Sequence, residues 1–266
     1  MGLYQNRIVI KVGTSTLTNE IGKSDLRAFD RLACVLADIQ NMGYEVILVS
    51  SGAIAVGANK LNMKSRPSSM RMKQAAAAVG QCSIMYLYDK FFGDYDKTIA
   101  QILLNAEDIE QEEKKENLTN TFNALLEMGI IPVVNENDSV SYTEIESEDR
   151  LFGDNDMLSA VVAVLCRAKR LVILSDINGL YDSDPRLHPE AKQIERIERI
   201  DQSVFSLAGG AGSRRGTGGM KTKLQAASLA TANGTDTVIV NGKHPEALYE
   251  IIRGNQAGTL FVGKKE

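Results

Sequence analysis

Two segments far apart in the chain combine lysine with glycine. Residues 11–18 (KVGTSTLT) start with Lys11 at the end of an apolar run and continue through Gly13. Residues 216–227 (GTGGMKTKLQAA) place three glycines before a helical pattern that carries Lys223. Glycine lets backbone N–H groups approach an anion closely, and a helix N-terminus favours negative charge. Both segments predict phosphate contacts, although a solvated strand end or a surface linker has a similar composition.

Neither segment is a standard nucleotide-binding motif. Met220 stands where the pattern GxxxxGK[ST] needs its last glycine, and residues 209–215 do not complete GxGxxG. The absence of a complete GxGxxG after a strand argues against an NAD-dependent dehydrogenase. The physical ingredients of a polyphosphate site are still present, because backbone donors, a helix N-terminus and a cation occur together.

Two further segments place small or polar residues directly after apolar runs. Residues 50–57 (SSGAIAVG) offer Ser51 and Gly52 at the start of a helix, which suits a substrate carboxylate. Asn135 ends the run IIPVVN and Asp138 follows it, and a carboxylate there suits an ammonium group. Ordinary turns capped by Ser or rich in Asn and Asp have the same composition, so both interpretations stay open.

Three consecutive polar residues, Asp154, Asn155 and Asp156, precede an apolar helical pattern. One of them can serve as the helix N-cap, but three exceed what a single cap needs. A carboxylate at this position can hold flexible lysine side chains in a fixed orientation. Ser175 and Asp176 follow the next apolar run, where either contacts with adenosine or ribose or a plain loop would fit.

The elements that must position these residues alternate along the chain. Short β-branched runs separated by longer amphipathic stretches predict a parallel sheet with helices on both faces. Ligands of such sheets bind beyond the C-terminal ends of the strands. The predicted strands are 7–12, 45–50, 97–104, 130–135, 170–175 and 237–240. The predicted helices are 26–42, 69–92, 117–128, 154–166, 220–233 and 244–253.

Composition narrows the class of protein. The chain has 266 residues, of which 44% are hydrophobic and 24% charged, and its formal net charge is −4. This balance argues against a general nucleic-acid-binding surface. Cys34, Cys82 and Cys166 are scattered, as in a reducing compartment, and His188 and His244 lack metal-ligand spacing. No signal peptide is visible, and no apolar run approaches the length of ~20 residues that a membrane helix needs. We therefore expect a cytoplasmic protein.

In this order, the segments KVGTSTLT, SSGAIAVG, NENDSV, GDND and GTGGMKTK resemble the glutamate 5-kinases of the amino-acid kinase group. The resemblance covers residues 7–254. It implies a three-layer αβα sandwich with a mainly parallel central sheet. It also implies ATP-dependent phosphorylation of the side-chain carboxylate of L-glutamate, the first step of proline biosynthesis. Fold alone leaves open another acceptor, such as aspartate, or a regulatory binding protein without turnover.

The resemblance also implies roles for residues at matched positions. Lys11 and Lys223 contact the transferred phosphoryl group, and Asp156 organises both lysines. The positions expected to bind glutamate are Ser51, Gly52, Asn135, Asp138 and Asn155. The positions expected to bind ATP are Lys11, Gly13, Ser175, Asp176, Thr217, Gly218, Gly219, Met220, Lys221, Thr222 and Lys223.

The remaining expectations concern ligands, partners and domains. Mg²⁺ is expected to arrive with ATP, held mainly by its phosphates rather than by protein ligands. Proline is the expected inhibitor, the expected assembly is a homo-dimer or homo-tetramer, and glutamyl phosphate reductase is a candidate partner. We expect one amino-acid kinase domain, with a glutamate-binding half at 1–153, an ATP-binding half at 154–266 and no C-terminal PUA domain. Residues 141–151 form a longer segment than in familiar members.

Overall fold

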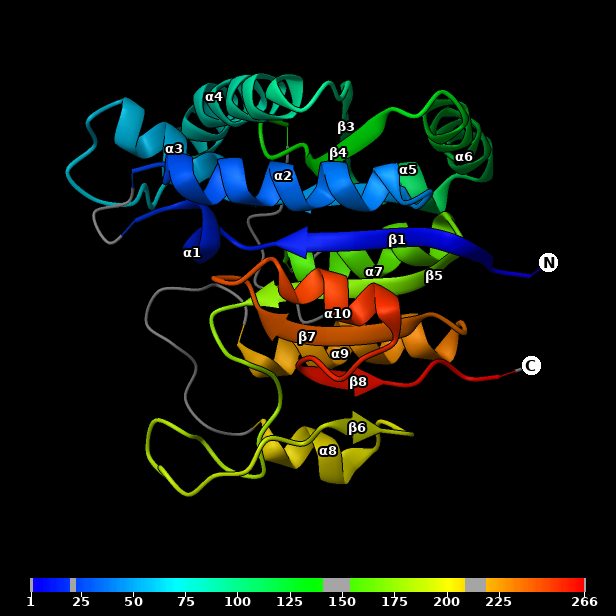
Figure 1. Ribbon diagram of the computed structural model, residues 1–266. Coiled ribbons are helices and arrows are strands. Elements are labelled where there is room, and N and C mark those ends of the chain that lie inside the picture. Colours follow the sequence, from blue (N-terminus) through cyan, green and yellow to red (C-terminus); the bar gives the residue numbers. More distant parts are fainter. Residues whose placement is uncertain (1, 20–22, 141–153, 209–218, 266) are drawn as a thin grey trace.

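The computed structural model describes residues 2–19, 23–140, 154–208 and 219–265 (Figure 1). The predicted segment 141–151 lies outside them. The strands found in the described part are β1 (Tyr4–Val12), β2 (Glu45–Ser50), β3 (Ile99–Leu104), β4 (Ile131–Glu136), β5 (Ala168–Ser175), β6 (Arg196–Ile197), β7 (Asp236–Asn241) and β8 (Thr259–Phe261).

These strands form one sheet in the order β3-β4-β2-β1-β5-β7-β8-β6. All pairings from β3 across to β7 are parallel. Within the described sheet, β8 and β6 run opposite to the other strands, because β8 is antiparallel to β7 and parallel to β6. The prediction of a mainly parallel sheet is therefore confirmed, and the C-terminal ends of β1, β2, β4 and β5 lie at the same edge.

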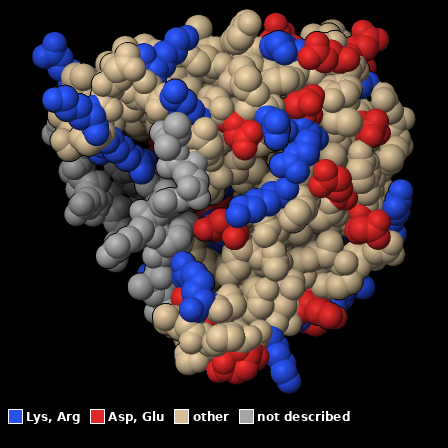
Figure 2. Space-filling model, turned by 60° about the vertical axis from the view of Figure 1, so that its left-hand side comes forward, with Lys and Arg blue, Asp and Glu red and all other residues tan. Residues whose placement is uncertain are grey.

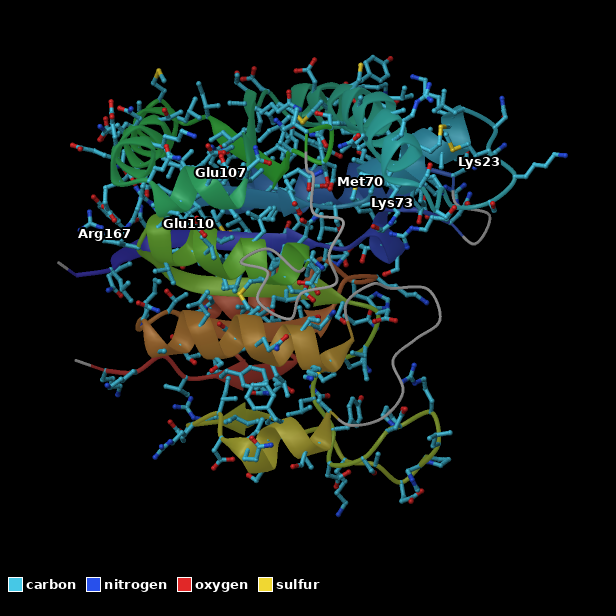
Figure 3. The ribbon with its side chains drawn as sticks, turned by 180° about the vertical axis from the view of Figure 1, so that it is seen from behind. Lys23, Met70, Lys73, Glu107, Glu110 and Arg167 are labelled. Atoms are coloured by element: carbon cyan, nitrogen blue, oxygen red, sulfur yellow. The ribbon has the colours of Figure 1, made fainter. Side chains whose placement is uncertain are left out.

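Helices cover both faces of the sheet (Figure 1). One hydrophobic core lies beneath α2, α3, α4 and α10, and the other lies between the sheet and α6, α7 and α9. Figure 3, seen from behind, shows α7 and α9 side by side in front of the sheet. The described helices are α1 (Thr14–Leu17), α2 (Leu26–Asn41), α3 (Ala53–Lys60), α4 (Met70–Asp94), α5 (Ala106–Glu110), α6 (Glu112–Glu127), α7 (Asn155–Leu165), α8 (Gln202–Leu207), α9 (Met220–Ala232) and α10 (Ala247–Arg253).

The alternation of side chains along β1 decides to which side of the sheet Lys11 points. Ile8, Ile10 and Val12 pack into the core beneath α2 and α4, whereas Val9 packs into the core with α7 and α9. Successive residues of a strand face opposite sides of the sheet. Lys11 has the parity of Val9, so its side chain leaves the sheet on the side of α7 and α9.

Helices α3 and α4 touch through two glycines. A Cβ atom on Gly57 would overlap the carbonyl oxygen of Ala76, and one on Gly80 would overlap the carbonyl oxygen of Ala53. No other residue type fits such a backbone approach without a shift of one helix. The contact fixes both helices relative to the end of β2, where α3 begins.

The predicted elements recur with small differences in their ends. β2 spans the predicted residues 45–50, whereas β1 begins three residues earlier than predicted, at Tyr4. α6 begins at Glu112 rather than at 117, because the charged run EEKKE lacks apolar periodicity but carries acidic residues that suit a first helical turn. No helix in the described part of the chain is long and apolar enough to span a membrane.

Candidate active site

Two lysines from distant parts of the chain meet on one carboxylate. Lys11 Nζ lies 2.6 Å from Asp156 Oδ1, and Lys223 Nζ lies 3.0 Å from Asp156 Oδ2. Both lysines are 7% exposed and Asp156 is 1% exposed. We refer to these three residues as the charged cluster. It joins the C-terminal end of β1 to the first turns of α7 and α9.

The first turn of α7 is fixed by its own cap. Asp154 is the N-cap, and its Oδ1 accepts hydrogen bonds from the backbone N–H groups of Asp156 and Met157 at 3.0 and 3.1 Å. This bond pattern is the ordinary function of an N-cap aspartate. It leaves the neighbouring Asp156 to face the lysines, so two of the three consecutive polar residues have separate structural tasks.

The first turn of α9 brings Lys223 to the same place. The helix starts after the N-cap Gly219, and Lys223 lies on its buried face with Leu224. The hydroxyl of Thr222 lies 3.1 Å from Asp156 Oδ2 and 3.0 Å from the carbonyl oxygen of Gly219, and its one proton is shared between these two acceptors. Asp156 is thus contacted by two consecutive residues of α9.

The electrostatics of the charged cluster favour an anionic ligand. Burial alone raises the pKa of the Asp156 carboxyl, but the charges and hydrogen bonds of Lys11 and Lys223 outweigh it and lower the pKa below its ordinary value. Asp156 therefore stays ionised near neutral pH. Among the described residues, the cluster brings two ammonium groups and one carboxylate together, so it attracts an incoming anion.

A second group of contacts ties together the ends of β2 and β4. The amide nitrogen of Asn155, the first residue of α7, donates to the carbonyl oxygen of Ser50 at 3.1 Å and to Asn135 Oδ1 at 3.0 Å. Ser51 Oγ donates to the carbonyl oxygen of Val12 at 3.0 Å. Four of the predicted segments therefore meet at the C-terminal edge of the sheet.

Glycines bring the loops after β1 and β2 close to each other. Gly52 has a φ of 104°, a left-handed conformation that side chains disfavour, and a Cβ there would lie 3.3 Å from Thr14 Oγ1. A Cβ on Gly13 would lie 3.6 Å from Lys11 Nζ. The backbone at Gly13 therefore passes directly beside the charged cluster.

Asp138 lies just beyond β4 and is half-buried. Burial raises its pKa to about 6, and the positive charge of Arg66, from the segment between α3 and α4, opposes that rise. A carboxyl group with this pKa changes its charge close to the physiological range. Its affinity for an ammonium group would follow that change.

The residues predicted to bind ATP are only partly described. Ser175 is 4% exposed at the end of β5, and its Oγ donates to Asp176 Oδ1 at 3.2 Å. Lys221 is exposed and does not share the buried face of Lys223. Residues 217–218 lie outside the described part of the chain. Figure 2 shows both basic and acidic side chains on one face of the molecule. The three residues of the charged cluster are buried beneath the surface.

Two residues at the site were not among the predicted ones. Thr14 lies against Gly52 and belongs to KVGTSTLT, so the segment itself was a signal for it. Gln81, in the middle of α4, accepts a hydrogen bond from Asn135 Nδ2 at 2.9 Å. Nothing in the alanine-rich sequence around Gln81 indicates that contact.

The mainly parallel sheet with helices on both faces is the fold of the amino-acid kinase class, and comparison with known proteins agrees. A model of the amino acid kinase family matches residues 6–241. The chain is 54% identical over 259 residues to a glutamate 5-kinase of Clostridium perfringens, covering 97% of this chain and 96% of that protein. It is 49% identical over 260 residues to a glutamate 5-kinase of Listeria innocua, covering 98% and 94%. The chain belongs to the amino acid kinase family, in its glutamate 5-kinase branch.

Solved structures share the fold at much lower identity. Carbamate kinase from Giardia lamblia, bound to AMP-PNP, has a TM-score of 0.67 at 14% identity and covers 97% of this chain and 98% of its own. UMP kinase from Bacillus anthracis has a TM-score of 0.65 at 14% identity and covers 98% and 97%. At this identity the likeness establishes the fold and nothing about the substrate.

Proposed function

We propose that this chain transfers the γ-phosphoryl group of ATP to the side-chain carboxylate of L-glutamate, giving L-glutamyl 5-phosphate in the first step of proline biosynthesis. The observation that carries the proposal is the meeting of Lys11 and Lys223 on Asp156, at 2.6 and 3.0 Å. Membership in the glutamate 5-kinase branch supports glutamate as the acceptor.

The chemistry has an electrostatic problem that the charged cluster is suited to solve. ATP and the glutamate carboxylate are both anions and repel each other. Negative charge also spreads over the transferred phosphoryl oxygens in the transition state. Lys11 and Lys223 would neutralise that charge, while Asp156 keeps their flexible side chains in place before the substrates arrive. Positioning and charge neutralisation then supply most of the catalysis.

The reaction needs no general base. The glutamate side chain is already ionised near neutral pH. One of its carboxylate oxygens forms a bond to the γ-phosphorus. The bond from that phosphorus to the bridging oxygen breaks, and ADP leaves with the electron pair. No proton changes place in this step, which agrees with a charged cluster built from lysines and a carboxylate.

The two substrates would occupy neighbouring parts of the strand edge. Glutamate would lie over residues 1–153, and ATP mainly over residues 154–266, with one sheet continuing through both halves. Mg²⁺, held mainly by the ATP phosphates, would add positive charge to the site. The glutamate site would use Ser51, Gly52, Asn135, Asp138 and Asn155. The ATP site would use Lys11, Gly13, Ser175, Asp176 and the residues from Thr217 to Lys223.

Regulation and assembly form part of the same proposal on the strength of the family resemblance. Proline would inhibit the enzyme, since it is the end product of the route. The enzyme would form a homo-dimer or homo-tetramer. Glutamyl phosphate reductase is the expected partner, because an acyl phosphate is labile in water and benefits from rapid use.

The direct test is Lys223→Ala, assayed by ADP release with glutamate and ATP. Loss of one charge-stabilising contact lowers turnover by about 10²–10³. The control is Lys115→Ala, which removes a partly exposed lysine of α6 that pairs only with Glu112 among its described charged neighbours. The control should keep wild-type kcat. A kcat for Lys223→Ala within a few-fold of wild type would remove the basis of the proposal.

A further inference from the structure

We propose that Gln81 is a positioning residue that orients the amide of Asn155 through the amide of Asn135. Asn155 would then present its oxygen to the α-ammonium group of the amino-acid substrate. This inference deepens the proposed function and rests on it. We refer to Gln81, Asn135 and Asn155 as the amide chain.

The contacts of the amide chain run across three elements. Asn135 Nδ2, at the end of β4, donates to Gln81 Oε1 on α4 at 2.9 Å. Asn155 Nδ2, at the start of α7, donates to Asn135 Oδ1 at 3.0 Å. The same Asn155 nitrogen donates to the carbonyl oxygen of Ser50, at the end of β2, at 3.1 Å.

One backbone group fixes the direction of all three amides. A carbonyl oxygen can only accept, so the group of Asn155 that faces Ser50 must be its NH₂. That NH₂ uses its second hydrogen on Asn135, which must therefore present its oxygen. Asn135 then turns its own NH₂ toward Gln81, whose oxygen accepts. A reversed amide anywhere in the chain would oppose two donors or two acceptors.

The direction of the amide chain leaves an acceptor at the substrate side. Both hydrogens of Asn155 Nδ2 are used, and no described residue donates to Asn155 Oδ1. An amide oxygen attracts an ammonium group and gains nothing from a methylene group. The amide chain would thus distinguish glutamate from glutarate, a dicarboxylate of the same length that lacks the ammonium group.

Gln81 is held where this task requires it. Its neighbour Gly80 lies so close to α3 that a Cβ would overlap the carbonyl oxygen of Ala53. Asn135 is 2% exposed, so water cannot readily replace Gln81 as the acceptor. Without Gln81, the Asn135 NH₂ loses its described acceptor, and the hydrogen bond that holds the Asn135 amide in place against Asn155 is lost.

The test compares two ligands on Gln81→Met, a variant of similar length with no amide. The KM for glutamate should rise about tenfold, the size expected for one lost hydrogen bond in a buried network. The kcat and the KM for ATP should stay within about twofold. The Ki of glutarate as a competitive inhibitor should not change, because glutarate has no ammonium group. Gln81→Ala should give the same result.

The matched control is Gln101→Met, at an exposed position of β3, which should leave all constants unchanged. A purely structural role for Gln81 would weaken glutamate and glutarate equally, and that result would overturn the inference. So would an unchanged KM for glutamate, or failure of both Gln81 variants to fold. If the wild-type chain itself does not phosphorylate glutamate, the proposed function fails, and this outcome is visible before any variant is made.

Discussion

The charged cluster and the amide chain each include one residue of the first turn of α7, Asp156 and its neighbour Asn155. The two groups are nevertheless organised by different forces. In the charged cluster, opposite charges attract over several ångströms, so the lysines find Asp156 whatever the fine details of their rotamers. In the amide chain, neutral groups attract only when each donor faces an acceptor. The direction comes from the Ser50 carbonyl, a backbone group. The site therefore combines a robust element for a phosphate with a directional element for an amino acid.

The largest effect should follow from breaking the charged cluster at its centre. Asp156→Asn leaves two buried lysines without their counter-charge, which costs about 3–5 kcal/mol of folding stability. The displaced lysines should also lower kcat by about 10²–10³. Urea unfolding and an ADP-release assay measure the two effects. A variant with wild-type stability and wild-type kcat would show that Asp156 does not organise the lysines.

A pH profile distinguishes the effect of Asp156 from that of Asp138, which follows Asn135 of the amide chain. Burial raises the pKa of Asp138 to about 6, so this group becomes protonated as the pH falls through that value. Only the ionised form attracts the substrate ammonium group. The kcat/KM for glutamate should therefore fall about tenfold per pH unit below about pH 6. Asp156 adds nothing in this range, because its pKa is lowered and it stays ionised.

The control for this profile is Asp138→Asn, which cannot titrate. Its kcat/KM should be lower than wild type at neutral pH and flat between about pH 5 and pH 7. An equally flat wild-type profile would show that Asp138 does not bind the ammonium group of glutamate.

The smallest effect should come from the support beneath Ser50. The hydroxyl groups of Ser50 and Tyr88 lie 2.9 Å apart and are buried, and burial raises the pKa of Tyr88. Tyr88→Phe should cost about 1 kcal/mol of stability in urea unfolding, the net value of one hydrogen bond. Tyr86→Phe, on an exposed position of the same helix, is the control. A loss equal to that of the control would show that the hydroxyl pair stabilises nothing.

Much of the fold follows from local patterns in the sequence. The apolar runs predict the central strands β1, β2 and β5, and the amphipathic pattern predicts the helix α2. The observed ends of these elements lie within a few residues of the predicted ends. Strand alternation also explains why Lys11 leaves the sheet toward α7 and α9. The short elements β6, α8 and β8 carry too few residues for a clear period, so their place at the sheet edge depends on tertiary contacts.

The two parts of the site differ in how far the sequence predicts them. Lys11, Asp156 and Lys223 stand in segments whose charge and glycine content indicate an anion site. Gln81 lies in a plain helix, and its hydrogen bond with Asn135 exists only because the folded chain brings α4 within reach of the end of β4. The direction of an amide depends on the carbonyl that it meets in the folded chain, and no spacing in the sequence encodes that.

Phosphorylation of the glutamate carboxylate can be measured directly with a hydroxamate trap on the wild-type chain. Hydroxylamine captures an acyl phosphate as it forms, so the colour yield reports phosphorylation of a carboxylate rather than ATP hydrolysis. We expect ATP-dependent hydroxamate from L-glutamate and far less from L-aspartate, whose shorter side chain places its carboxylate away from the two lysines. No hydroxamate from glutamate, or a greater yield from aspartate, would contradict it.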